Sequence, residues 1–187
     1  DFPPVMEIRL GDAVLIYEKV GWDVDGAVQG LRYGENPGQQ AALFRPVNGN
    51  LVLGDVQTIQ PGRFLASDVE LLQSGKHPGK TNITDTDNAL NILRYFADEQ
   101  VVAIMKHNNP CGVAFGESLL DAYTRANEAD RVAAFGGTIA LNRPVDVPTA
   151  EAIAENYSEV VVAPGFEQGV MDIFAKKKNL RVMQIAD

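Results

Sequence analysis

The second half of the chain alternates short apolar runs with amphipathic stretches, and this alternation is its most regular feature. Runs that are short and rich in β-branched residues predict strands. The predicted strands cover residues 101–106, 132–141, 159–163 and 181–185. Helices are predicted between them over residues 118–128, 148–157 and 167–177. Such alternation favours parallel strands joined by right-handed crossovers, so we predict a three-layer α/β fold with a mostly parallel sheet.

The first hundred residues have a weaker pattern. Residues 1–30 predict one strand, centred on the apolar run 13–17, and then a loop rich in turn residues. We interpret them as an extension of a single domain over residues 31–187, because a chain of 187 residues favours one core. The elements predicted next are strands over 41–44 and 56–59, a helix over 64–72, and a helix that begins near 84–87.

Composition narrows the class of protein. Hydrophobic residues make up 45% of the chain and charged residues 22%, which is typical of soluble globular proteins. No apolar run approaches the roughly 20 residues that cross a bilayer, and we identify no targeting leader. The net charge of -9 and pI near 4.7 disfavour nucleic-acid binding, which needs clustered Lys and Arg. We expect a cytoplasmic protein that binds neither nucleic acid nor membrane, and the single Cys111 agrees with a reducing compartment.

The strongest candidate chemistry follows the predicted strand 101–106. Lys106 is a permanent cation, and the adjacent His107 is a residue type suited to general acid–base catalysis. In open α/β sheets ligands bind beyond the carboxyl ends of the strands, so we expect both residues in such a crevice. Pro110 and Gly112 allow a close approach of the backbone to a ligand. The alternative is an ordinary strand end with solvated Lys and His side chains, and the residues alone favour neither interpretation.

A second candidate is the polar loop over residues 31–40, which contains Arg32 and Tyr33 between glycines and a proline. Its hydrogen-bonding groups suit a recognition loop, although a polar surface turn is the simpler interpretation of the residues alone. His77 has no Cys or second His at ligand spacing, so we expect its side chain to be solvated.

Four stretches together resemble the AICAR transformylase region of the bifunctional purine-biosynthesis enzymes, in order and in spacing. They are Leu31–Gln40, Asn82–Asp87, Lys106–Ala114 and Phe135–Asn142. The resemblance implies a cytidine-deaminase-like fold, of which this chain spans the first of two lobes. It departs at Gly38, where the family usually has a His. Any role of that His in substrate contact or packing is therefore open in this chain.

The resemblance also implies the function: formyl transfer from 10-formyltetrahydrofolate, as co-substrate, to the nucleotide AICAR. It implies that His107 is the general base and that Lys106 stabilises the oxyanion or protonates the leaving folate nitrogen. The remaining implied site residues bind the two substrates. They are Arg32, Tyr33, Asn82, Asn109, Phe135, Gly136 and Asp146. We expect no metal, because the chain lacks the Cys and His-x-Glu pattern of zinc deaminases.

Three interpretations of function remain open. The chain is a short transformylase, or a non-catalytic nucleotide-binding module or subunit of a split enzyme, or an IMP cyclohydrolase. The intact Lys106–His107 pair favours catalysis, whereas Gly38 and the single lobe favour the module. Because family sites draw on both lobes and a dimer interface, we expect a homodimer or a partner chain that supplies the second lobe.

Overall fold

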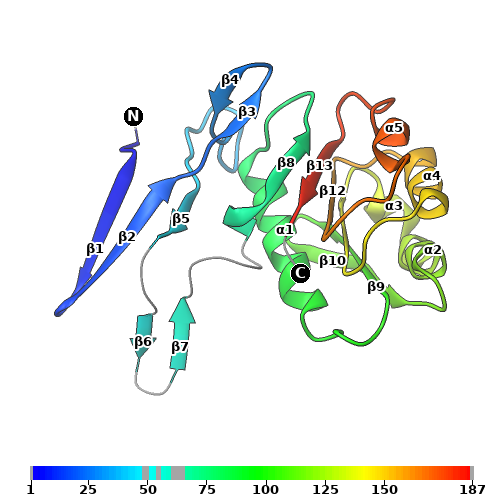
Figure 1. Ribbon diagram of the computed structural model, residues 1–187, viewed down its shortest axis with the longest axis horizontal. Coiled ribbons are helices and arrows are strands. Elements are labelled where there is room, and N and C mark those ends of the chain that lie inside the picture. Colours follow the sequence, from blue (N-terminus) through cyan, green and yellow to red (C-terminus); the bar gives the residue numbers. More distant parts are fainter. Residues whose placement is uncertain (1, 48–50, 54–55, 60–65, 186–187) are drawn as a thin grey trace.

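The computed structural model describes residues 2–47, 51–53, 56–59 and 66–185, and it has two parts. Small antiparallel sheets form the first part, and a six-stranded sheet covered by helices forms the second (Figure 1). The strands of the first part pair as β1-β2-β5, as β3-β4 and as β6-β7. They are β1 (Val5–Leu10), β2 (Ala13–Lys19), β3 (Trp22–Val24), β4 (Ala27–Gln29), β5 (Phe44–Pro46), β6 (Leu51–Leu53) and β7 (Val56–Ile59).

The large sheet has the strand order β10-β9-β11-β12-β13-β8. Its strands are β8 (Glu70–Gln73), β9 (Val101–Lys106), β10 (Asn109–Phe115), β11 (Thr138–Leu141), β12 (Val160–Ala163) and β13 (Arg181–Gln184). Only β11, β12 and β13 run parallel to one another, whereas β9 is antiparallel to both of its neighbours and β8 is antiparallel to β13. The predicted α/β class is confirmed, but the prediction of a mostly parallel sheet is wrong because the sheet is mixed.

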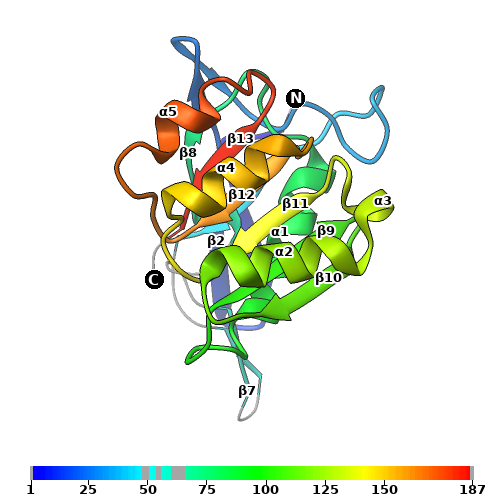
Figure 2. The ribbon, with the colours of Figure 1, turned by 90° about the vertical axis from the view of Figure 1, so that its right-hand side faces the viewer.

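Helices cover both faces of this sheet, which gives three layers (Figure 2). The helices are α1 (Lys80–Leu93), α2 (Leu119–Ala129), α3 (Arg131–Ala134), α4 (Val147–Glu155) and α5 (Val170–Phe174). On one face α2, α3, α4 and α5 pack on strand residues such as Ile104 and Val161. On the other face α1 packs on Met105 and Val162, together with Trp22 from the first part of the chain.

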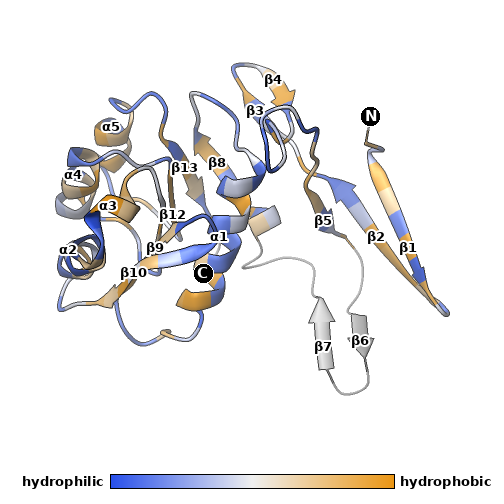
Figure 3. Cartoon of the chain, turned by 180° about the vertical axis from the view of Figure 1, so that it is seen from behind, coloured by the Kyte–Doolittle hydropathy of each residue, from blue (hydrophilic) through white to orange (hydrophobic). Residues whose placement is uncertain are grey.

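Both cores follow from the alternation of side chains along each strand. Val102 and Ile104 face one core while Ala103 and Met105 face the other, so a strand buried on both faces is apolar throughout. α1 and α2 carry both hydrophobic and hydrophilic residues, as expected of helices that cover a sheet on one side only (Figure 3). None of the helices in the described ranges is long and apolar enough to cross a membrane.

Three local predictions are wrong. The helix predicted over 64–72 is a 3₁₀ turn over Ala66–Asp68 followed by β8, while residues 64 and 65 lie outside the described ranges. The strand predicted over 132–141 starts only at Thr138, because Gly136 adopts a left-handed conformation that ends α3. The helix predicted to begin near 84–87 starts earlier, at Lys80, because the Asn82 side chain accepts a hydrogen bond from the Gly79 N–H and so caps the helix there.

The amino-terminal prediction was also too simple. Residues 1–30, predicted as one strand and a loop, contain two β-hairpins in their described part, β1-β2 and β3-β4. Asp25 and Gly26 both have positive φ, which suits the tight turn between β3 and β4. The predicted domain boundary falls between β4 and the polar loop that starts at Leu31.

Candidate functional site

His107 and Asn108 form the two-residue turn between β9 and β10. Lys106 pairs with Asn109 across this turn, and His107 and Asn108 have φ values of 52° and 65°. Positive φ at both central residues defines the type I′ turn that suits the twist of a hairpin. Neither His107 nor Asn108 is glycine, so the turn is strained. The expected strand end at Lys106 is confirmed, and His107 stands on an exposed turn rather than on extended backbone.

A buried carboxylate lies beneath this turn. Asp85 on α1 is 4% exposed, and its Oδ1 accepts a hydrogen bond of 2.6 Å from the backbone N–H of Asn108. Burial raises the pKa of the Asp85 carboxyl, and the Asn108 N–H opposes that shift. The turn that carries His107 is therefore bound to a helix on the adjoining layer.

The Lys106 ammonium binds the corner between α3 and β11. Its Nζ donates to the carbonyl oxygens of Phe135 at 3.0 Å and Gly136 at 2.9 Å. Gly136 has a φ of 69°, and a Cβ there would lie 3.1 Å from Lys106 Nζ, so glycine allows this approach. The Phe135 ring is 65% exposed and contacts the Tyr157 ring at a centroid distance of 5.1 Å. The structure thus brings together three of the predicted residues: Lys106, Phe135 and Gly136.

Asn82 joins the start of α1 to two charged side chains. Its Oδ1 accepts from the backbone N–H of Gly79 at 2.9 Å, and its Nδ2 donates to Glu159 Oε2 at 3.0 Å. The same Glu159 oxygen lies 3.9 Å from Nη1 of Arg181, which is 6% exposed and donates through Nε to the Lys76 carbonyl at 2.9 Å. Burial lowers the pKa of Arg181, and the Glu159 carboxylate opposes that shift.

The polar loop that begins at Leu31 is fixed against the start of α1. The Arg32 N–H donates to Pro78 O at 2.9 Å, and the Lys80 N–H donates to Tyr33 O at 3.0 Å. A Cβ on Gly79 would lie 3.1 Å from the Tyr33 ring, so a glycine permits this packing. The Tyr33 and Arg32 side chains also act electrostatically on the buried Arg181 guanidinium. Arg32 and Tyr33 therefore belong to the same neighbourhood as Asn82.

His77 contacts the backbone just before Leu31, where the polar loop begins. Its side chain is half-buried, and its Nδ1 lies 2.7 Å from the carbonyl oxygen of Gly30. The prediction of a freely solvated His77 is wrong, because this contact connects the segment before α1 to the end of β4.

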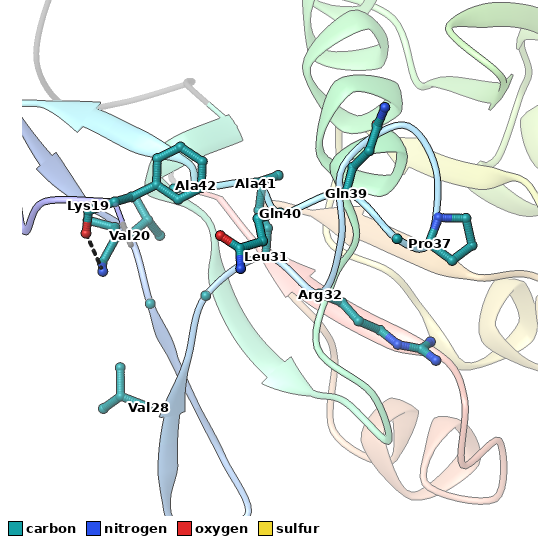
Figure 4. Close-up of a pocket in the computed structure, with 14 residues that line it drawn as sticks. Lys19, Val20, Val28, Leu31, Arg32, Pro37, Gln39, Gln40, Ala41 and Ala42 are labelled. Atoms are coloured by element: carbon teal, nitrogen blue, oxygen red, sulfur yellow. Dashed lines mark hydrogen bonds between the residues drawn. The ribbon is translucent and has the colours of Figure 1, made fainter.

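A cavity of about 610 Å³ opens beside the polar loop (Figure 4). Among its lining residues, Gln40 and Leu31 lie between Lys19 and Val20 on one side and Arg32 on the other. The other lining residues are Phe2, Gly21, Val28, Gly30, Pro37, Gly38, Gln39, Ala41 and Ala42. A Cβ built on Gly38 meets no other atom within 4 Å, so the structure has open space for a larger side chain at this position.

The register of the sheet explains why these groups meet. Because β9 runs antiparallel to β11, Met105 pairs with Thr138, which is the first residue of β11. Lys106 therefore lies at the amino ends of β11, β12 and β13, where Glu159 precedes β12 and Arg181 begins β13. The prediction that Lys106 lies beyond the carboxyl ends of parallel strands is wrong, since only its own strand ends there.

Two predicted residues lie elsewhere in the fold. Asp146 is the N-cap of α4, where its Oδ1 accepts from the Thr149 N–H at 2.8 Å, and it follows the carboxyl end of β11. The Asn109 side chain donates to the carbonyl of His107 at 2.9 Å and is otherwise exposed on the hairpin. Within this chain Asp146 is thus separated from Lys106 by the length of β11, and the substrate roles of both residues stay predictions.

Sequence reasoning missed Glu159 and Arg181. Each lies at the start of a predicted strand, 159–163 or 181–185, where a charged residue next to an apolar run is unremarkable. The sequence does contain one indication, because the first positions of adjacent parallel strands lie side by side, so charged residues at the starts of two such strands are expected to be neighbours. This indication points to the candidate site only once β9 is known to end at the same edge of the sheet.

Cys111 is half-buried with its Sγ donating to Ile104 O at 3.4 Å, and burial raises the pKa of its thiol, as expected of an unreactive cysteine. Among the described residues, no group of three or more His, Cys, Asp or Glu side chains could hold a metal ion.

Known proteins that are similar to this chain belong to the family that its sequence motifs resemble. Residues 17–187 match the family described as the AICARFT/IMPCHase bienzyme. The chain belongs to this family. It is 43% identical to the bifunctional purine biosynthesis protein PurH of Oceanobacillus iheyensis over 158 aligned residues, and these residues make up 84% of the chain. It is 47% identical over 157 residues to the PurH protein of a Ruegeria species, which covers 83% of the chain.

The chain corresponds to a minor part of these relatives. The aligned region is 28% of the Oceanobacillus protein and 27% of the Ruegeria protein. Membership of the AICARFT/IMPCHase family is therefore shown for a segment, and two activities are named for the bienzyme as a whole. Which of them the segment serves must be argued from its own residues.

Proposed function

We propose that this chain acts in formyl transfer from 10-formyltetrahydrofolate to AICAR, as the single-lobe part of a transformylase. The observation that carries the proposal is the convergence at the amino ends of β11, β12 and β13. At this edge of the sheet Lys106 contacts Gly136 and Asn82 contacts Glu159, and the exposed His107 turn directly follows Lys106. A hydrogen-bonding cluster beside a candidate general base is a suitable arrangement for proton transfer on a polar substrate.

The nucleotide would lie against the surface that the polar loop and the start of α1 form together. Arg32 offers a guanidinium that can bind a phosphate through two parallel hydrogen bonds. Tyr33, Asn82 and Glu159 offer further donors and acceptors next to it. The exposed Phe135 ring provides an apolar surface beside Lys106, which suits the pterin or benzoyl ring of the folate.

The chemistry requires one base and one donor. The AICAR amine attacks the formyl carbon and gives its proton to His107, while the bond from that carbon to the folate nitrogen breaks as the nitrogen takes up a proton. Lys106 stabilises the oxyanion or supplies that proton. An ammonium has three N–H donors, and the contacts to Phe135 and Gly136 use two of them, which leaves one for the substrate.

A second candidate is a nucleotide-binding subunit that needs another chain for catalysis. His107 is exposed, so water reaches the reacting atoms and weakens the preorganised electrostatics that catalysis requires. The aligned segment is also less than a third of its relatives. We therefore propose that a second copy, or a chain that carries the other lobe, completes the site, with the homodimer favoured.

Two measurements test these proposals. AICAR at 100 times its dissociation constant should stabilise the protein by about 2.7 kcal/mol, and ribose 5-phosphate should stabilise it less. Equal shifts in melting temperature for the two ligands would contradict the nucleotide site. Light scattering combined with a formyl-transfer assay then separates the two candidates. An active dimer supports the transformylase, an inactive protein that binds AICAR supports the subunit, and a fully active monomer contradicts the need for a partner.

A further inference from the structure

Asp85 is a buried acid that the proposed chemistry does not use. It lies on α1, three residues after Asn82, so both side chains share one face of the helix. Asn82 contacts the residues proposed to bind the nucleotide, whereas Asp85 contacts the turn that carries His107. One rigid helix therefore connects the proposed nucleotide site with the proposed base.

The turn at His107 and Asn108 needs such a support. Both residues adopt positive φ, which is unfavourable for side chains other than glycine, although asparagine tolerates it better than histidine. The hairpin itself provides little restraint near the turn. Pro110 directly follows the Lys106–Asn109 pair, and it has no N–H to donate. The register of β10 against β9 then shifts between Pro110 and Gly112.

The contact from Asp85 supplies this restraint from another layer. Its carboxylate accepts the Asn108 N–H at 2.6 Å, and a hydrogen bond to an ionised acceptor is about twice as strong as a neutral one. Because Asp85 is 4% exposed, water cannot readily replace the lost partner if this bond breaks.

We propose that Asp85 is a positioning residue, whose hydrogen bond to Asn108 holds the left-handed turn and thereby directs the His107 imidazole at the substrate. The catalytic part of this proposal rests on the proposed function, in which His107 is the base. The structural part, that Asp85 fixes the turn, stands on the geometry of the chain alone. The two parts can be tested separately.

The test compares Asp85→Ala, Asp85→Asn and the double variant Asp85→Ala with Asn108→Gly. Asp85→Ala removes the acceptor, while Asp85→Asn keeps a weaker, neutral one and has the same shape. Glycine at position 108 adopts positive φ without strain, so it lets the turn form without support. Ala89→Gly is the matched control. It lies one turn further along α1, is fully buried and weakens the helix without contacting the turn.

Three quantities are measured for each variant: hydrogen exchange at the Asn108 amide, kcat for formyl transfer, and the dissociation constant of AICAR. Asp85→Ala should speed Asn108 exchange and lower kcat, each by about 10-fold to 100-fold, with AICAR affinity changed by less than about threefold. Asp85→Asn should show less than about a tenfold loss of kcat, since it keeps an acceptor. The double variant should recover at least about fivefold in kcat relative to Asp85→Ala.

Several results would overturn the proposal. If Asn108 exchange is unchanged in both Asp85→Ala and Asp85→Asn, Asp85 does not hold the turn. If Ala89→Gly loses as much kcat as Asp85→Ala, or if Asn108→Gly gives no recovery, Asp85 only stabilises the fold. If the parent protein, alone or completed by its partner, transfers no formyl group, the proposed function and the catalytic part fail together. The exchange measurement still decides the structural part in that case, including when Asp85→Ala does not fold, because Asp85→Asn preserves the packing.

Discussion

The two ends of the parallel strands β11, β12 and β13 differ in chemistry. At their amino ends the side chains of Lys106, Glu159 and Arg181 lie within one hydrogen-bonded and ion-paired neighbourhood. At their carboxyl ends a hollow of about 560 Å³ is lined largely by apolar side chains, including Leu90 and Ile185. The same strands therefore carry a polar end and a largely apolar end.

The polar groups that do occur at the carboxyl end are used to hold the backbone. The side chain of Asn142 donates to the carbonyls of Phe96 and Glu99, both at 2.8 Å, and accepts from the N–H of Val101 at 2.8 Å. Asp146 caps a helix. The three contacts of Asn142 use most of the hydrogen-bonding capacity of its side chain, whereas Lys106 keeps a free donor and His107 is exposed. Polar side chains therefore indicate a candidate site only where their contacts with the backbone leave some hydrogen-bonding capacity for a ligand.

The sharpest test of this comparison is the loss of His107. His107→Ala should lower formyl transfer by roughly 100-fold to 10,000-fold, because general base catalysis contributes about that much. AICAR affinity should stay nearly constant, since a neutral imidazole adds little ground-state binding. Transfer kinetics and isothermal titration on the same samples measure both effects. Unchanged turnover would remove His107 from the mechanism.

Two asparagines at opposite ends provide a matched pair. Asn82→Ala should weaken AICAR binding by about 10-fold to 100-fold, because Glu159 loses a hydrogen bond near the nucleotide. Asn142→Ala should leave AICAR affinity within about threefold, yet lower the free energy of unfolding by about 2 kcal/mol or more, because three backbone groups lose their partner. Titration calorimetry and urea denaturation separate the two outcomes, and equal losses of affinity would mean that the two ends do not differ in function.

The buried Asp85 makes stability depend on pH at the polar end. Burial raises its pKa above the ordinary value of 3.8, so the folded protein holds this proton more tightly than the unfolded chain. The contribution of Asp85 to the free energy of unfolding therefore decreases as the pH rises from that value through the raised pKa. The Asp85→Asn side chain cannot ionise. Urea denaturation between about pH 4 and pH 7 should show the variant gaining stability relative to the parent as the pH rises, and a flat difference would contradict the shift.

The smallest expected effect concerns Gly38, at the cavity beside the polar loop. The structure has open space around a Cβ at this position, so Gly38→His should change the free energy of unfolding by no more than about 0.5 kcal/mol. If the usual His of the family contacts the nucleotide, the same variant should bind AICAR more tightly. Thermal melts with and without AICAR measure both quantities. A large loss of stability would show that the space is filled by groups that cannot move.

The sequence determined the elements whose signal is local. Helices α2 and α4 and strands β9, β12 and β13 lie within about two residues of their predicted bounds, because apolar periodicity depends only on neighbouring residues. The motif that contains Lys106 and His107 was also found without structure. β10 was missed because Pro110 and Gly112 are unusual in strands. An edge strand with a register shift tolerates both of them.

Only the tertiary structure decided which groups meet. Periodicity indicates which face of a strand is buried but not which neighbour it pairs with or in which direction. The hairpin at His107 and Asn108 reverses the chain, and β9 then pairs antiparallel with β11, so Lys106 lies at the amino ends of the parallel strands. Glu159, Arg181 and Asp85 join the candidate site for the same reason. Their contacts to Asn82 and Asn108 connect segments distant in the sequence, and such long-range pairings leave no local pattern along the chain.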